Sequence, residues 1–219
     1  KRLKKILNKN FTLIGISFRN LDLRIPAYGP MNYLKYIHKS GYLNELERLI
    51  NFSKAKKPNT ELIIGGAGFT VLAKELMDKY KNMDFGIGGE SEITLTELTK
   101  NIEHPEKVKG VYYRKDNKLF FTGRGKKIKN IDFIPKRDIK GFTNLKSYDS
   151  VGIQTKRGCN FNCVYCTEPH IQEGLLILRN IGSVIKEVRG IKKKHGVSKI
   201  VFADCVINYP VKHFEQLCK

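Results

Sequence analysis

Three cysteines lie close together late in the chain, at Cys159, Cys163 and Cys166. Each thiolate can bind one iron of a 4Fe-4S cube, so three thiolates leave the fourth iron without a protein ligand. A small molecule that carries an amino-acid group can bind this open iron through its amine and carboxylate. A sulfonium in the same molecule would then lie within reach of an electron from the cluster. The spacing therefore predicts a cluster with one iron open to a small molecule.

Zinc is the alternative that the same residues leave open. Cys159, Cys163, Cys166 and His170 together supply the four ligands of a tetrahedral zinc site. A structural zinc site more commonly uses two separated ligand pairs, which favours the iron–sulfur interpretation. The chain has five cysteines in all. An odd number with three in one short run indicates metal binding in a reducing compartment rather than a disulfide framework.

The net charge of +20 raises nucleic acid as a partner, because clustered cations gain free energy when they release counterions from phosphate chains. Lysine outnumbers arginine 31 to 10, and the lysines are scattered along the whole chain. No basic run is interleaved with aromatic residues, as a base-stacking platform requires. We therefore expect solvated basic surfaces, and not nucleic acid as the partner.

The hydrophobic residues, 41% of the chain, are spread along the sequence. No uncharged stretch approaches the roughly 20 residues that a membrane-spanning helix needs. The basic start of the chain lacks the apolar block and the cleavage site of a secretion signal. We expect a cytoplasmic protein without a membrane span.

The first half of the chain alternates between strand-like and helix-like stretches. Short apolar runs that indicate buried strands lie at 11–17, 61–66 and 83–89. Helical stretches follow them at 42–56, 70–81 and 92–101. Three such units with glycines at the strand ends predict an α/β fold with an open, doubly wound parallel sheet, in which ligands bind at the carboxyl ends of the strands.

The pattern changes after residue 108. Aromatic runs at 111–113 and 119–121 predict a β-hairpin, and the stretch 123–150 has no clear periodicity. A second module then opens with a strand at 151–155 and continues through the cysteines. It goes on to a helix at 183–195, a strand at 199–203 and a helix that begins at Pro210. The predicted domains are 1–122, a linker at 123–150, and 151–219.

The cysteine loop resembles that of the radical S-adenosylmethionine superfamily, which shares this spacing and an aromatic residue before the last cysteine, here Tyr165. The wider stretch 154–169, with Glu173-Gly174 and Arg179, is similar to the cobalamin-dependent branch. The first module carries three further similarities to the cobalamin-binding domain of that branch. These are Gly15-Ile16-Ser17, Gly65-Gly66 with Thr70, and Gly88-Gly89-Glu90-Ser91-Glu92.

The resemblance implies a Rossmann-like parallel sheet of the cobalamin-binding type, followed by the start of a radical SAM partial (β/α) barrel. It implies three cofactors: a 4Fe-4S cluster on the three cysteines, S-adenosyl-L-methionine, and cobalamin. Tyr165 would lie near the adenine of S-adenosylmethionine, and Asp204 would contact its amino group. The residues implied to contact cobalamin are Ser17, Gly65, Gly66, Thr70, Gly89 and Glu90.

The implied reaction is methylation of an unactivated carbon of a small-molecule substrate. A 5'-deoxyadenosyl radical removes hydrogen, methylcobalamin delivers the methyl group, and a second S-adenosylmethionine remethylates the cobalamin. An electron donor such as flavodoxin or ferredoxin is the expected partner. Ring formation and rearrangement also occur in this branch, and the residues do not distinguish these outcomes from methylation.

Two other classes of function stay open. A radical SAM methylthiotransferase acting on RNA would share the cysteine loop and suit the basic charge. Its first domain should carry three more cluster cysteines, and none precedes Cys159 here. A non-catalytic zinc-binding module would suit the charge alone.

The sequence departs from the family pattern in two respects. The Asp-x-His-x-x-Gly motif of other cobalamin proteins is absent, and its nearest match, Tyr36-x-His38-x-x-Gly41, lacks the aspartate. We expect His38 to be a surface histidine, and enzymes of this branch often do without a histidine ligand. The chain also supplies only about two of the roughly six strands of a radical SAM barrel. We therefore expect a fragment of a longer protein.

Overall fold

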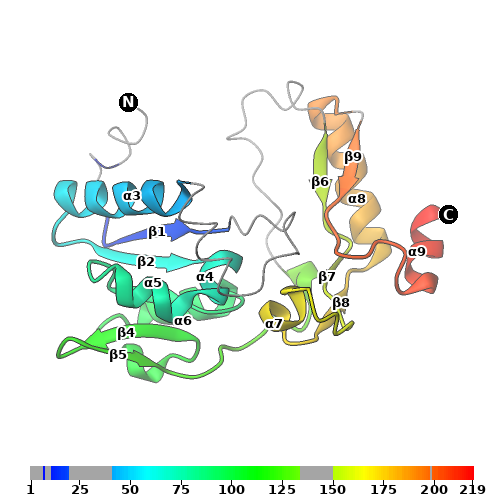
Figure 1. The fold of residues 1–219 in the computed structure, drawn as a ribbon. Helices are drawn as coiled ribbons and strands as arrows, with labels where there is room; N and C mark the ends of the chain where they lie inside the picture. The colour runs from blue at the N-terminus through cyan, green and yellow to red at the C-terminus, as the bar shows by residue number, and fades with distance from the viewer. Residues whose placement is uncertain (1–6, 8–10, 20–40, 134–149, 198) are drawn as a thin grey trace. The chain divides into compact units, whose positions relative to one another are not determined.

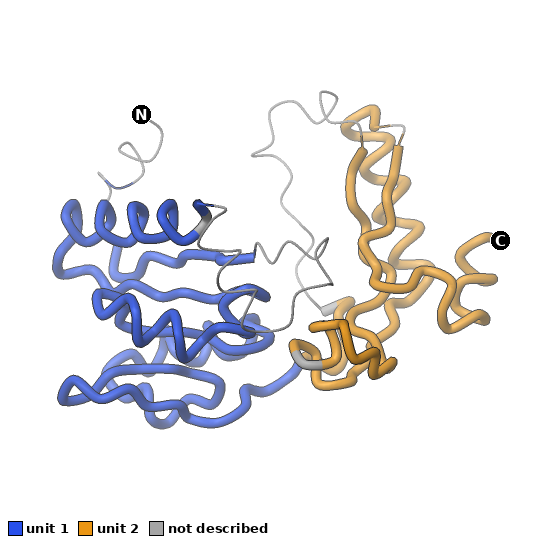
Figure 2. Tube along the Cα trace, in the orientation of Figure 1, with its two compact units in different colours: residues 1–127 blue, residues 128–219 orange. Residues whose placement is uncertain are grey.

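The computed structural model describes residues 7, 11–19, 41–133, 150–197 and 199–219 of the 219-residue chain (Figure 1). The chain divides into two compact units, Lys1–Lys127 and Ile128–Lys219 (Figure 2). The predicted boundaries at 122 and 150 stay a prediction, because much of the expected linker, 134–149, lies outside the described residues.

Unit 1 is built on a five-stranded sheet in the order β1-β2-β3-β4-β5. The strands are β1 (Leu13–Ser17), β2 (Glu61–Gly65), β3 (Phe85–Ile87), β4 (Val111–Lys115) and β5 (Lys118–Phe121). The first three are parallel, and their register sets Ser17 opposite Gly65. The carboxyl ends of these parallel strands therefore lie along one edge of the sheet.

Helices cover both faces of this sheet. They are α3 (Tyr42–Lys56), α4 (Ala67–Val71), α5 (Ala73–Lys79) and α6 (Glu92–Lys100), with a 3-10 turn, η1 (Pro105–Lys107). Successive side chains of a strand point to opposite faces. Leu62 and Ile64 of β2 accordingly pack with α3 and α5 in one core, and Ile63 packs with Leu98 of α6 in another. The predicted α/β sheet with two covered faces is confirmed.

Two details of unit 1 differ from the expectation. The single helix predicted at 70–81 is two helices, because Leu72 has a non-helical φ of −119° and its N–H donates to both Gly68 and Phe69 carbonyls. The predicted hairpin is present, with Asp116 and Asn117 at positive φ in its two-residue turn. It also pairs antiparallel with β3, so the sheet is mixed rather than wholly parallel.

Unit 2 contains two small sheets. The strands β6 (Val151–Ile153) and β9 (Ile200–Phe202) are parallel, and β7 (Lys156–Gly158) and β8 (Leu176–Leu178) are antiparallel. The helices are α7 (Glu168–Gln172), α8 (Ile181–His195) and α9 (Val211–Cys218), with the 3-10 turn η2 (Ile131–Phe133). Within the described part of the chain these strands form no closed barrel, which agrees with the expected start of a partial barrel.

The core of unit 2 lies between β6 and α8, where Ile153 and Val184 are fully buried. The helix α8 begins at a side-chain cap, because the Asn180 side chain accepts a hydrogen bond from the Ser183 N–H. It ends at Gly196 in the left-handed conformation. This helix is longer than predicted by two residues at its start.

The pair β7 and β8 was not expected from the sequence, which placed 156–158 in the loop. Gly158 has a φ of 80°, and a Cβ at this position would meet the Leu175 carbonyl oxygen at 2.0 Å. Only glycine allows β7 and the chain before β8 to approach so closely. The strand that leads into the cysteines therefore depends on this residue.

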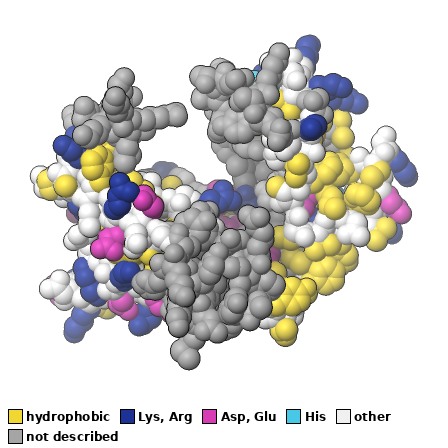
Figure 3. Space-filling model, turned by 45° about the horizontal axis from the view of Figure 1, so that its top comes forward, with side chains coloured by type: hydrophobic (Ala, Val, Ile, Leu, Met, Phe, Trp, Pro, Cys, Tyr) yellow, Lys and Arg dark blue, Asp and Glu magenta, His cyan; other side chains and the backbone are white. Residues whose placement is uncertain are grey.

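No helix among the described residues is long and apolar enough to cross a membrane. On the face drawn in Figure 3, Lys and Arg side chains are scattered among other residue types over the described parts of both units.

Candidate metal and cofactor sites

The cysteine loop starts directly after β7. Cys159 is buried, Cys163 is half-buried and Cys166 is exposed, and none of them forms a disulfide. The Cys166 N–H donates to the Cys163 carbonyl at 3.0 Å, which closes a tight turn between these two residues. Three free thiols on one loop are the donor set that an iron–sulfur cluster uses.

The three thiols are not arranged as the ligands of a single metal ion. No group of three or more His, Cys, Asp or Glu side chains in the described ranges is arranged to hold a metal ion. The donor chemistry thus fits a cluster, which needs its thiolates spread around a cube rather than around one ion. His170, the fourth ligand of the zinc alternative, belongs to α7, but its side chain lies outside the described residues, as does His38.

Tyr165 stands on the loop with 72% of its surface exposed. A hydrogen bond with the Cys163 side chain and the charge of that thiol raise the pKa of the Tyr165 phenol. The predicted contact between this ring and an adenine stays a prediction.

Asp204 follows β9 and holds the junction between β6 and β7. Its Oδ1 accepts hydrogen bonds from the backbone N–H groups of Thr155 at 2.9 Å and Lys156 at 3.2 Å. Its Oδ2 accepts from the Thr155 hydroxyl at 2.6 Å. A carboxylate offers about four acceptor positions, so three of them are used within the protein. The predicted contact of Asp204 with a cofactor amino group stays a prediction.

Thr155 is a buried residue with several hydrogen-bond partners, and its sequence context did not indicate this role. Its carbonyl accepts from the Arg179 N–H at 2.9 Å and lies 3.2 Å from the His213 Nε2. Both Thr155 and His213 are buried. Segments after β6, β8 and β9 and the helix α9 therefore meet at one residue, four positions before Cys159.

Arg179 connects further parts of unit 2. Its guanidinium forms ion pairs with Asp132 at 3.2 Å and Glu187 at 2.7 Å, and it also donates to the Gln154 carbonyl at 2.7 Å. All three charged side chains are largely buried. The residue that the family resemblance singled out here has a structural role in this chain.

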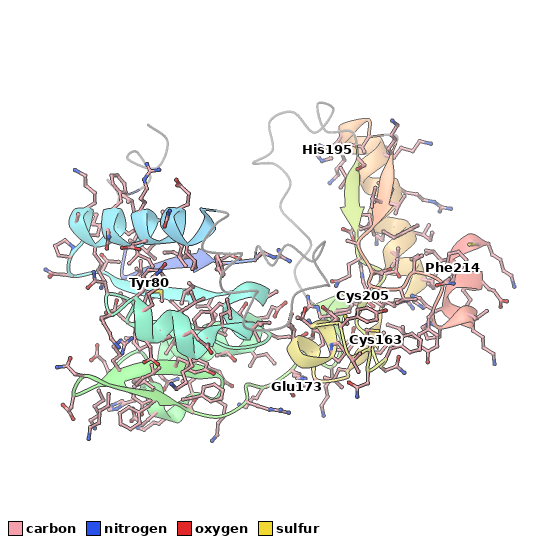
Figure 4. The ribbon with its side chains drawn as sticks, in the orientation of Figure 1. Tyr80, Cys163, Glu173, His195, Cys205 and Phe214 are labelled. Carbon is pink, nitrogen blue, oxygen red and sulfur yellow. The ribbon has the colours of Figure 1, made fainter. Side chains whose placement is uncertain are left out.

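Cys205 was also missed, although it lies near the loop. Partial desolvation and the neighbouring Glu168, with a smaller influence of Cys159 and Cys166, raise the pKa of its thiol to about 12. Figure 4 labels Cys205 and Cys163 in the same region of unit 2. Because β9 brings Cys205 to the loop from 39 residues beyond Cys166, no local signal in the sequence indicates this proximity.

The carboxyl edge of the unit 1 sheet carries the residues predicted to contact cobalamin. Ser17 ends β1 and is exposed. The Thr70 hydroxyl donates to the Gly66 carbonyl at 3.0 Å and accepts from the Gly89 N–H at 2.9 Å. Thr70 thereby joins the turn after β2 to the turn after β3. Glu90, which is half-buried, directly follows that second turn.

The glycines of this edge differ in what surrounds them. A Cβ on Gly66 would lie 2.7 Å from the Phe18 carbonyl oxygen, whereas a Cβ on Gly89 would meet nothing within 4 Å. Both residues have a positive φ, at 102° and 81°. Gly66 is therefore required by the protein's own packing, and open space adjoins Gly89. Gly65 lies in ordinary contact with Ile87 of β3.

Comparisons with known proteins place this arrangement among known folds. No protein-family model matches the chain. The radical S-adenosylmethionine methyltransferase TsrM from Kitasatospora setae, solved with tryptophan and a SAM analogue bound, superposes with a TM-score of 0.74. The likeness covers 99% of this chain and 41% of TsrM at 18% identity, and it shows the fold.

Curated relatives have a higher sequence identity to this chain than TsrM has. The anaerobic magnesium-protoporphyrin IX monomethyl ester cyclase of Synechocystis sp. is 27% identical over 167 residues, which are 72% of this chain and 33% of the cyclase. The ribosomal protein uS12 methylthiotransferase RimO of Dictyoglomus thermophilum is 30% identical over 160 residues, which are 71% of this chain and 31% of RimO. The chain thus spans about a third of the length of these relatives. In fold, the chain is similar to part of a radical S-adenosylmethionine methyltransferase, which has also been solved with cobalamin and a [4Fe-4S] cluster bound.

Proposed function

We propose that this chain is the cofactor-binding part of a radical S-adenosylmethionine enzyme that uses cobalamin to methylate an unactivated carbon of a small molecule. The observation that carries the proposal is the loop of three free thiols directly after β7. It lies in a chain that shares its fold over 99% of its length with a radical S-adenosylmethionine methyltransferase.

The loop residues would hold the iron and the small sulfonium cofactor. Cys159, Cys163 and Cys166 would each bind one iron, and the exposed ring of Tyr165 would stack near the adenine. When bound, the reduced cluster supplies the electron that cleaves S-adenosylmethionine, and methylcobalamin supplies the methyl group. Asp204 has one acceptor position left for the cofactor amino group, because three are used by Thr155 and Lys156.

The edge of unit 1 would hold the cobalamin. The exposed Ser17 hydroxyl and the open space beside Gly89 support contact with a large ligand there. Thr70, Gly65 and Gly66 would support the site mainly by fixing the turns that present it. We propose a reducing cytoplasm and an electron donor such as flavodoxin or ferredoxin as the setting in which these residues work.

A methylthiotransferase is the second candidate, favoured by the 30% identity with RimO. The chain opposes this candidate, because no cysteine precedes Cys159 to hold a second cluster. Retention of added hydroxocobalamin separates the two classes, since only the first proposal requires a bound corrin.

The experiment is anaerobic reconstitution of the chain with ferrous iron and sulfide, followed by addition of hydroxocobalamin. We expect about four irons and four acid-labile sulfides per chain, and a corrin absorbance that stays with the protein through gel filtration. Retention of about one zinc per chain, with neither iron nor sulfide, would overturn the radical chemistry. An iron–sulfur band without retained corrin would remove the cobalamin part alone.

A further inference from the structure

We propose that Tyr209 is a positioning residue that fixes Asn160 and Phe161, at the start of the cysteine loop, and that the buried Lys156 holds the Tyr209 backbone in place. These contacts are called the brace below. The inference rests on the proposed function, because it explains how one of the cluster thiols is placed. Tyr209 lies after β9 and is not part of any motif considered in the sequence.

Tyr209 contacts the loop and the preceding strand β7 through three different groups. Its carbonyl accepts a hydrogen bond from the Lys156 ammonium. Its hydroxyl lies 3.3 Å from the Asn160 Nδ2, which donates to it. Its ring packs against the Phe161 ring with centroids 4.7 Å apart. These three partners lie on both sides of Cys159 in the sequence, so a single residue from a distant part of the chain contacts the segments that flank this thiol.

Lys156 makes the brace rigid. Its side chain is 2% exposed, and its ammonium donates to the carbonyls of both Val206 and Tyr209. A buried ammonium is costly unless its donors are partnered. Displacing the segment 206–209 would therefore leave this charge without two of its acceptors, which opposes the movement. The Lys156 N–H is held in turn by Asp204.

Burial in the loop is highest at its first cysteine, next to β7. Cys159 is 9% exposed, whereas Val164 is fully exposed and Tyr165 is 72% exposed. Cys159 is thus packed on the protein, whereas Asn160 and Phe161 beyond it are exposed, Cys163 is half-buried and Cys166 is exposed. Metal binding can order exposed ligands such as Cys166, because binding and local folding are coupled.

The test compares the iron retention of three variants of the whole chain after anaerobic reconstitution. Tyr209→Leu removes the ring, and Tyr209→Phe keeps the ring but loses the hydroxyl. Tyr113→Leu is the matched control, because Tyr113 pairs with Phe120 at 5.5 Å in the β-hairpin of unit 1. The readouts are the rate of iron loss to a chelator and the electron paramagnetic resonance spectrum of the dithionite-reduced cluster.

We expect Tyr209→Leu to lose iron at least about ten times faster than the unmodified chain, because supporting residues change metal affinity by roughly 10- to 100-fold. Tyr209→Phe should stay within about threefold, since it loses a single hydrogen bond. Tyr113→Leu should match the unmodified chain. The spectrum of the reduced cluster should change in Tyr209→Leu and stay unchanged in Tyr113→Leu. A change in Tyr209→Leu alone would show that losing an aromatic contact elsewhere in the chain does not alter the cluster.

The possible results distinguish failure of the brace from failure of the proposed function on which it rests. If the unmodified chain takes up no iron and sulfide, the proposed function fails and takes the brace with it. If the unmodified chain assembles a cluster and Tyr209→Leu holds iron equally well with an unchanged spectrum, the brace alone is wrong. Should Tyr209→Leu fail to fold, Phe161→Leu removes the same ring contact from the loop side, and an unchanged rate of iron loss there overturns the brace.

Discussion

The carboxyl edge of the unit 1 sheet and the cysteine loop of unit 2 are built in opposite ways. At the edge, the protein's own hydrogen bonds close the turns: Thr70 joins Gly66 to Gly89, and the Phe18 N–H donates to the Gly65 carbonyl at 2.8 Å. In the loop, Cys159 is packed on the protein, Cys163 is half-buried and Cys166 is exposed, and the three do not form the ligand group of a single metal ion.

This difference suggests what each ligand would have to contribute. Sites for organic ligands are usually largely preformed. A metal cluster can contribute enough binding free energy to order its own ligands. The edge should therefore be insensitive to iron, and the loop should reach its final geometry only with iron bound. The variants below test whether the two regions respond as separately as this comparison requires.

The largest effect is expected from replacing all three loop cysteines with serine. Cys159→Ser/Cys163→Ser/Cys166→Ser should reduce bound iron from about four per chain to almost none, and it should leave hydrogen exchange of the β2 amides unchanged. Cys218→Ser is the control, because Cys218 is an exposed cysteine on α9. Full iron content in the triple variant would show that the loop is not the metal site.

The next effect is expected from Gly86→Ala in β3, which acts on unit 1 alone. The added Cβ would lie 2.3 Å from the Cζ of Phe69, a side chain with no exposed surface. Overpacking of this kind should lower the free energy of unfolding of unit 1 by about 3 kcal/mol, measured by urea denaturation.

Gly190→Ala is the matched control for Gly86→Ala, because a Cβ there meets nothing within 4 Å. This position lies in α8, where alanine should stabilise the helix by about 0.5–1 kcal/mol. Iron content should be unaffected in both variants. A loss of iron in Gly86→Ala would contradict the independence of the two regions.

An intermediate effect is expected from Thr155→Val at the base of the loop. The variant loses the 2.6 Å hydrogen bond to Asp204, and hydrogen bonds to charged groups contribute about 1.5–3 kcal/mol. We expect a loss of about 2 kcal/mol in the unfolding free energy of unit 2, together with faster iron release. Thr155→Ser retains the hydroxyl and should remain close to the unmodified chain. Equal iron release from both variants would show that this hydroxyl does not support the loop.

The smallest effect is expected from Thr70→Val. It removes the bridge between the turns after β2 and β3, which should cost about 1 kcal/mol in unit 1. If the edge is a platform for cobalamin, retention of added hydroxocobalamin should fall while iron content stays constant. Thr96→Val, which removes only a local bond to the Glu92 carbonyl, is the control. If Thr70→Val and Thr96→Val retain equal amounts of corrin, Thr70 does not contribute to cobalamin binding.

The sequence predicted the parts of the molecule that depend on local pattern. The helix α3 has the predicted bounds, and the glycines and the serine expected at strand ends lie at the carboxyl edge of the sheet. The spacing of the three cysteines also gave the predicted cluster site, which stays a prediction. In each case the signal lies within a few neighbouring residues, where periodicity and turn chemistry act.

The contacts that support the loop could not be predicted from the sequence, because they join residues that are far apart in the chain. Thr155 meets Asp204 and Lys156 meets Tyr209 across about 50 residues, and neither partner carries a local pattern that points to the other. The strands β7 and β8 have three residues each, too few for an alternating pattern to show. Tertiary packing also separated α4 from α5, where the sequence continued as one helix.

The central claim is that the three loop thiols hold a cluster whose fourth iron is open to a small molecule. The most direct test is the electron paramagnetic resonance spectrum of the reconstituted, dithionite-reduced chain before and after addition of S-adenosylmethionine. We predict a cluster signal whose shape changes when S-adenosylmethionine is added. A cluster signal that S-adenosylmethionine leaves unchanged, or a protein that binds zinc and gives no signal, would contradict the claim.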